Sequence, residues 1–176
     1  MAADIKEVLY SVIDDIGRDK IRAEVSADIN AASKKYCEEI LGKCIKALGH
    51  QTDDETLGTM CEALMHFMLT ASLLPSERKV NVNGIELDVV IPSVKSLVKD
   101  PSRALVIQVV KNNTADRVRE AEKAQPNAGN LWVVSARPIE TGHVNYALKG
   151  RYQSIISDIR AFLKDKGVSS LKMLHG

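Results

Sequence analysis

The sequence predicts an α/β protein that begins with a helical part. Apolar residues recur at three- and four-residue steps as far as Leu48, as they do in amphipathic helices. Alternating apolar residues then flank Asn83-Gly84, a pair typical of a two-residue type I′ hairpin. Two further apolar runs, residues 104–111 and 130–136, are separated by a helical pattern. From Asp53 onward we therefore expect the order helix, strand, strand, strand, helix, strand, helix.

Two helices are expected before residue 50. The first spans residues 3–16, and the second spans about 18–48 and stops at Gly49. A third helix begins at residues 52–55, where Thr52 and Glu55 have capping-box spacing, and it ends before Pro75. Its second half is apolar on most sides, which predicts that it is covered on more than one side.

The Asn83-Gly84 turn fixes the register of the predicted hairpin. One face then carries six apolar residues: Val80, Val82, Ile85, Leu87, Val89 and Ile91. Glu86, Asp88 and Val90 share the other face. Beyond Pro92 we expect a short helix or loop, a strand over 104–111 that is covered on both faces, and a helix over 114–125 that starts from Thr114. A fourth strand over 130–136, a polar connection and a final helix up to Gly167 complete the prediction.

The composition is that of a globular protein. The chain has 176 residues, of which 45% are hydrophobic and 27% charged, so it is long enough for a real core and unlike disordered or disulfide-rich chains. No run approaches about 18 uncharged apolar residues, and the acidic N-terminus is unlike a signal peptide. We therefore expect a cytoplasmic protein without a membrane partner. The three cysteines are expected to be buried thiols.

Charge is distributed unevenly along the chain. Residues 1–76 contain 8 basic and 13 acidic residues, a net charge of −5, whereas residues 77–176 contain 16 and 10, a net charge of +6. The basic half is the half that carries the predicted sheet. This is compatible with a polyanionic partner there, and equally with a solvated surface.

The order of elements, with Asp88 near the end of the second strand and Lys111 at the end of the third, resembles the PD-(D/E)xK nuclease superfamily, including archaeal Holliday junction resolvases and restriction endonucleases. The resemblance covers about residues 53–165. It implies a restriction-endonuclease-like αβββαβ core, a mixed four-stranded sheet flanked by helices. The nuclease-like domain would then be 51–167, with 1–50 as an N-terminal helical extension and 168–176 as a tail.

The resemblance also implies Mg²⁺ or Mn²⁺ as cofactor, with Asp88 as a metal ligand and Lys111 as a catalytic residue that aids the attacking water. Phosphodiester hydrolysis needs a hard cation, and such cations take oxygen ligands. A nearby lysine can orient the water or neutralise developing charge. Unpaired charges buried for stability alone would cost several kcal/mol each.

The sequence leaves open which residue supplies a further metal ligand. The superfamily places an acid two residues before the lysine, and that position here is Val109. Gln108 is one residue earlier and faces away unless a bulge turns it, so it is one candidate. Glu86 shares a strand face with Asp88, and Glu62 lies on a polar stripe of the preceding helix. Either of these carboxylates could complete the site.

Several functions follow from these residues. Four basic side chains are candidates for contact with a nucleic-acid backbone: Arg117, Arg119, Lys123 and Arg137. A metal-dependent nuclease acting on DNA rather than RNA is one hypothesis. A second is an inactive nuclease-fold module that binds nucleic acid or scaffolds a complex. A third is a protein whose N-terminal helices, residues 3–48, form a homodimer or partner interface, with the sheet domain incidental to that function. Each of these roles has a structural alternative. Asp88 and Lys111 could form an ion pair that stabilises the sheet, and Gln108 could hydrogen-bond to backbone groups.

Overall fold

The structure is a computed structural model, and it describes residues 4–50, 52–112 and 115–168. The helices are α1 (Ile5–Ile16), α2 (Arg18–Ala27), α3 (Ile29–Leu48), α4 (Asp54–Ala71), α5 (Val94–Lys99), α6 (Ala115–Ala124) and α7 (Ile155–Asp165). The strands are β1 (Glu77–Val82), β2 (Ile85–Ile91), β3 (Leu105–Val110), β4 (Leu131–Ser135) and β5 (Val144–Ala147). Within the described residues, no helix is long and apolar enough to cross a membrane.

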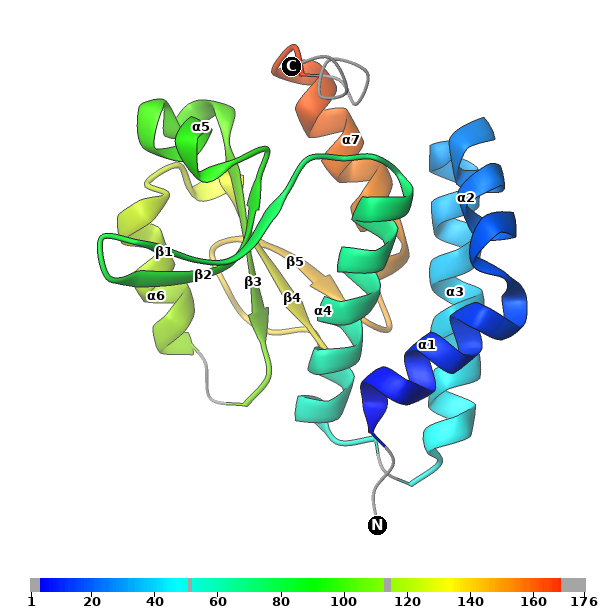
Figure 1. Cartoon of the computed structure of the whole chain (residues 1–176). Coiled ribbons are helices and arrows are strands. Elements are labelled where there is room, and N and C mark those ends of the chain that lie inside the picture. The colour runs from blue at the N-terminus through cyan, green and yellow to red at the C-terminus, as the bar shows by residue number, and fades with distance from the viewer. Residues whose placement is uncertain (1–3, 51, 113–114, 169–176) are drawn as a thin grey trace.

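The strands form one mixed sheet in the order β1-β2-β3-β4-β5 (Figure 1). The first three strands pair antiparallel, and β3, β4 and β5 pair parallel. The four predicted strands are confirmed, and so is the turn, in which Asn83 and Gly84 both have positive φ. The fifth strand corrects the predicted number. It was missed because β5 has only four residues, of which Tyr146 and Ala147 alone are buried.

Helices cover both faces of the sheet, with a buried apolar cluster on each side. On one face β3 contributes Leu105, Ile107 and Val109 to a cluster shared with α4 and α7. On the other face Val106 packs with α5 and α6. The strand is therefore buried on both faces, as its continuous apolar sequence predicts.

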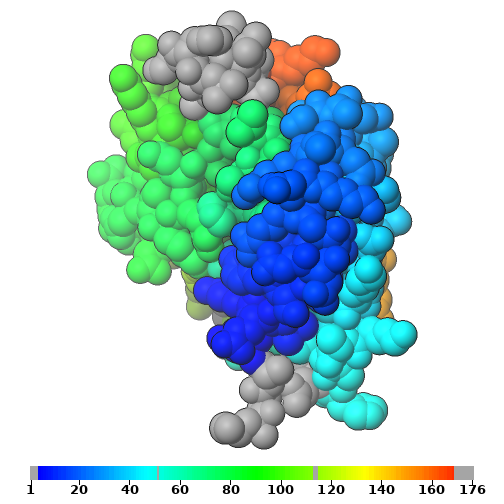
Figure 2. Space-filling view, turned by 45° about the vertical axis from the view of Figure 1, so that its right-hand side comes forward, coloured from blue at the N-terminus to red at the C-terminus, as the bar shows by residue number. Residues whose placement is uncertain are grey.

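The N-terminal helices belong to the same core as the sheet. Leu9 and Ile13 of α1, Val25 of α2 and Tyr36 of α3 are buried in the cluster that also contains Val109 of β3. In Figure 2 the blue surface of α1 and α2 lies directly against the green surface of the residues that follow α4. The apolar sides of these helices thus pack largely against the rest of the chain. Less apolar surface is left on them for the dimer interface that the sequence allowed.

Two details of the helices differ from the prediction. The single helix expected over 18–48 is broken at Asp28, whose extended backbone (φ −152°) reverses the chain so that α2 lies against α3. The Asp28 carboxylate accepts a hydrogen bond from Ala31 N–H at 3.1 Å and so caps α3. Helix α4 is capped by Asp53 rather than Thr52. Thr114 and the tail beyond Val168 lie outside the described residues.

Every second side chain of strand β2, counted from Ile85, points to one face of the sheet before Asp88 and to the other face after it. Val80, Val82, Ile85 and Leu87 lie in the α6-side cluster, as a shared face requires, but Val89 and Ile91 lie in the α4-side cluster. The predicted single face of six apolar residues is therefore wrong beyond Leu87. The physical reason is local: regular pairing between β2 and β3 stops at Val89, and the strand turns where the ladder is interrupted.

Candidate functional site

Strands β2 and β3 separate at Asp88 and Gln108, and these two side chains fill the gap. Regular pairing ends at Val89 and Ile107, so the next pair would be Asp88 with Gln108. Instead Gln108 Oε1 accepts a hydrogen bond from Asp88 N–H at 2.7 Å, and Asp88 Oδ2 accepts one from Val109 N–H at 2.8 Å. Both residues are 1% exposed. Side-chain groups thus replace the missing backbone bonds, which buried backbone groups require.

Gln108 also ties the hairpin to α6. Its Nε2 donates to Glu86 O at 3.2 Å and to Arg117 O at 3.5 Å. The pairing of β3 with β4 runs without interruption from Val106 to Val110, so no bulge turns Gln108 toward Lys111. The amide is engaged by three backbone groups, as in the structural alternative for this residue. Its catalytic role stays a prediction.

Asp88 carries a two-pronged ion pair with Arg117 at the start of α6. Arg117 Nη2 donates to Asp88 Oδ1 at 2.9 Å, and Nη1 donates to Oδ2 at 3.1 Å. Burial alone would raise the pKa of Asp88, but the hydrogen bonds and charge of Arg117, with the Val109 N–H, hold it below the ordinary value. The same bond raises the pKa of Arg117. Asp88 is therefore a buried carboxylate that is kept ionised.

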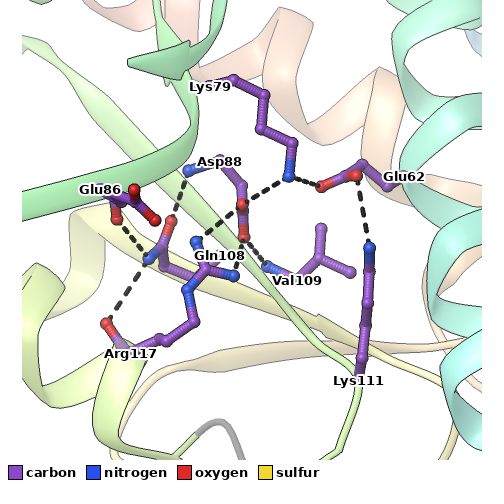
Figure 3. A network of polar contacts seen from close by, with 8 residues as sticks. All are labelled: Glu62, Lys79, Glu86, Asp88, Gln108, Val109, Lys111 and Arg117. Carbon is purple, nitrogen blue, oxygen red and sulfur yellow. Dashed lines mark hydrogen bonds and ion pairs between the residues drawn. The ribbon is translucent and has the colours of Figure 1, made fainter. Parts of the chain in front are cut away.

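Lys79 of β1 joins Asp88 to Glu62 of α4 (Figure 3). Lys79 Nζ lies 3.1 Å from Asp88 Oδ1 and 2.9 Å from Glu62 Oε2. Burial lowers the pKa of Lys79, but the bonds and charges of the two carboxylates outweigh it and raise the pKa. The residue has φ of +52°, a left-handed conformation that is strained for lysine. This strained backbone places the ammonium between two acids.

Lys111 follows β3 and is the third cation, after Arg117 and Lys79, in the cluster around the carboxylates of Asp88 and Glu62. Its Nζ lies 3.6 Å from Glu62 Oε1, and its side chain is 26% exposed. The close approach of Lys111 to α4 depends on Gly58, because a Cβ at that position would lie 2.8 Å from Lys111 Cγ. Glu62 of α4 thus faces the site, between Lys79 and Lys111. Asp88 and Lys111 are linked through Glu62 and Lys79, as Figure 3 shows, and not as a direct pair.

The remaining candidates lie at or outside the edge of this cluster. Glu86 is exposed and lines a pocket of about 420 Å³ together with Lys79, Asp88 and Arg117. Its charge contributes to the raised pKa of Arg117. Three exposed basic residues each pair with an acid outside the cluster: Arg119 with Asp116, Lys123 with Glu120, and Arg137 with Asp54. Of the four basic candidates, the structure brings only Arg117 to Asp88.

A resident divalent cation does not fit the side chains in this arrangement. Among the described residues, no group of three or more His, Cys, Asp or Glu side chains could hold a metal ion. Asp88 Oδ1 already accepts from Lys79 and Arg117, and Oδ2 accepts from Val109 and Arg117, which uses the acceptor sites of the carboxylate. Three cationic side chains face two buried carboxylates, so the cluster carries its own neutralising charge.

Lys79 is the member that sequence reasoning missed. The signal was present, because the hairpin register pairs Arg78 with Val89 and Val80 with Leu87 and so places Lys79 opposite Asp88. Opposite charges at such positions attract. Arg117 was identified, but as a contact for a nucleic-acid backbone. Its pairing with Asp88 spans 29 residues and leaves no local pattern in the sequence.

Comparison with known proteins gives a match of structure and none of sequence. No family model and no curated protein sequence matches the chain. The structure is similar to that of restriction endonuclease PspGI in a complex with substrate DNA, with a TM-score of 0.61 and 17% identity. The match covers 93% of this chain and 86% of the endonuclease chain, so it includes much of the N-terminal helical part. At this identity, the likeness establishes the fold alone.

Proposed function

We propose that this chain, which has a restriction-endonuclease-like fold, is a nuclease-like protein that binds the DNA backbone at the Asp88 cluster without cleaving it. Lys79, Lys111 and Arg117 are the cations that would contact phosphate. The observation that carries the proposal is that these three side chains neutralise the two buried carboxylates, Asp88 and Glu62. Among these five side chains, exposed Glu86 at the rim not included, one cation is in excess, which favours an anion over a divalent metal.

The accessibility of the three cations supports this proposal. The side chain of Lys79 is 54% exposed, that of Lys111 26% and that of Arg117 35%. The pocket of about 420 Å³ is lined by Lys79 and Arg117 together with Asp88 and Glu86, and it is large enough for a phosphodiester group. Guanidinium groups bind phosphate oxygens in pairs, and ammonium groups bind them as point charges. The contact with DNA would be extended by Arg119, Lys123 and Arg137. Their exposed ion pairs are weak, so these side chains can exchange an acidic partner for a phosphate.

DNA is the proposed partner rather than RNA because the similar endonuclease structure is a complex with substrate DNA. Binding of this kind is governed by phosphate contacts and releases counterions. It therefore requires no base-reading motif, and it weakens as salt rises.

A second candidate function is Mg²⁺-dependent hydrolysis of DNA, with Asp88 and Glu62 as metal ligands and Lys111 as the catalytic lysine. One observation favours it: Asp88 and Glu62 converge on one point, the ammonium of Lys79, with Lys111 beside them. This candidate requires Lys79 to leave that point.

The experiment that separates the two candidates measures binding and cleavage in the same samples. Fluorescence anisotropy with labelled duplex, single-stranded and branched DNA would be recorded in EDTA and in Mg²⁺ or Mn²⁺, and plasmid cleavage would be followed in parallel. We expect equal affinity with and without metal, and no cleavage. Lys111→Ala should weaken binding and lower the slope of log K against log salt by about 1.

The matched control is Arg160→Ala, which removes the same charge from α7, outside the cluster. It should leave both affinity and salt slope unchanged. If the protein cleaves DNA in metal, and Asp88→Ala and Lys111→Ala both abolish cleavage, hydrolysis is the function. If the protein neither binds nor cleaves any of these DNA forms, both candidates are wrong.

A further inference from the structure

We propose that Lys79 is a built-in cation that keeps divalent metal ions out of the space between Glu62 and Asp88, and that neutralising Lys79 creates a metal site there. The inference concerns the same side chains as the proposed function, but it does not depend on DNA binding. It assigns a specific role to a residue of β1 that the sequence did not single out.

The position of Lys79 Nζ is the first argument. It lies about 3 Å from one oxygen of each carboxylate, Asp88 Oδ1 and Glu62 Oε2, which come from different elements. Divalent Mg²⁺ and Mn²⁺ bind through one or two carboxylates and complete their shell with water. The ammonium therefore holds the two oxygens that such an ion would use.

The strained backbone of Lys79 is the second argument. A lysine with φ of +52° is costly by about 1 kcal/mol or more, so a side chain that simply covered the surface would not require it. In this conformation the ammonium donates to both acids, and about half of the side chain stays exposed. The strain is offset by the two charge-assisted bonds.

Removal of this one charge leaves the rest of the site in place. Asp88 keeps the Val109 N–H and the forked bond from Arg117, and Glu62 keeps Lys111 at 3.6 Å. Two cationic side chains then balance two carboxylates, and one acceptor position is free on each of Asp88 Oδ1 and Glu62 Oε2. Exposed Glu86 on the adjoining pocket adds further negative potential.

The test uses the full chain and Mn²⁺ alone, without DNA. Calorimetric titration should show no Mn²⁺ binding at millimolar concentration for the wild type. Lys79→Met should bind Mn²⁺ with an affinity at least about tenfold above the detection limit set by the wild-type titration. In the variant, millimolar Mn²⁺ should also raise Tm, since a ligand that binds the folded state stabilises it. The double variant Lys79→Met/Glu62→Gln should lose this binding again.

Arg78→Met is the matched control, because it removes one positive charge from the neighbouring position of the same strand. It should bind Mn²⁺ no better than the wild type. Lys79→Gln gives a second route if the methionine variant does not fold, since its amide can still donate to one carboxylate. Wild-type binding as tight as that of the variants, no Mn²⁺ binding by folded Lys79→Met and Lys79→Gln, or equal gains from Arg78→Met and Lys79→Met, would overturn the proposal.

Discussion

Gln108 Oε1 accepts a hydrogen bond from the Asp88 backbone N–H at 2.7 Å, at the point where β2 and β3 stop pairing. In return, Asp88 Oδ2 accepts from the Val109 N–H at 2.8 Å. The two side chains hold the strands apart while satisfying the buried backbone between them. At this opening Arg117 of α6 donates to the buried carboxylate of Asp88, and Lys79 reaches the same carboxylate from β1.

Gln108→Ala should destabilise the protein. It leaves the Asp88 N–H buried without a partner, and such a group costs about 1–3 kcal/mol. Gln108→Glu should also destabilise, because an ionised carboxylate cannot donate to Glu86 O and Arg117 O. Urea unfolding at neutral pH measures both. Unchanged stability in both variants would show that the bonds of Gln108 are dispensable.

Gly58→Ala should displace Lys111. Alanine normally stabilises a helix interior by about 0.5–1 kcal/mol relative to glycine, but at Gly58 its Cβ would lie 2.8 Å from Lys111 Cγ. We expect stability to gain less than this or to fall, and DNA affinity to fall in the same direction as we expect for Lys111→Ala. Gly42→Ala in α3 is the control and should show the full gain, because a Cβ at Gly42 would meet no atom within 4 Å beyond the neighbouring backbone of its own helix. Equal gains at both positions would mean that the contact is harmless.

Stability should fall in acid through Asp88. Its pKa is lowered in the folded state, so its contribution is fully present above the unfolded pKa, about 4, and is lost as pH falls through the lower folded value. Asp88→Asn should therefore be less stable than the wild type at pH 7, and the difference should shrink below pH 4. Urea midpoints at pH 7, 4 and 3 measure this. A constant difference over that range would contradict the assignment.

The three cysteines should be unreactive in the folded protein. All three are buried, and burial raises the pKa to about 12 for Cys37 and to about 11 for Cys44. Burial also raises the pKa of Cys61. Because the thiolate is the reactive form, a thiol reagent at pH 8 should label none of them until denaturant is added. Rapid labelling of any cysteine under native conditions would show that its helix opens locally.

Much of the fold could be predicted because its signals are local. The hairpin follows from Asn83-Gly84, and the burial of β3 follows from its unbroken apolar run. Asp88, Glu62 and Lys111 were also identified, and they lie in one cluster. The break at Asp28 was hidden, because Asp28 sits within an otherwise continuous helical pattern and acts only through its cap. β5 was hidden by its length of four residues.

The charge balance of the site could not be predicted in the same way. It depends on where β2 and β3 separate, and on contacts such as Arg117 with Asp88 that join residues far apart in the sequence. The faces of Gln108 and Val109 could be assigned from strand alternation, but the use of the Gln108 amide by three backbone groups could not. Lys79 could have been placed opposite Asp88 by counting from the turn.

We expect protein cations, and not a metal ion, to balance Asp88 and Glu62 in the wild-type protein. The decisive measurement is anomalous scattering from wild-type crystals grown in millimolar Mn²⁺. We expect no manganese peak between Asp88 Oδ1 and Glu62 Oε2, with Lys79 Nζ in density at that point. A manganese peak there, with the Lys79 side chain displaced into solvent, would show that a metal ion takes the place of the lysine.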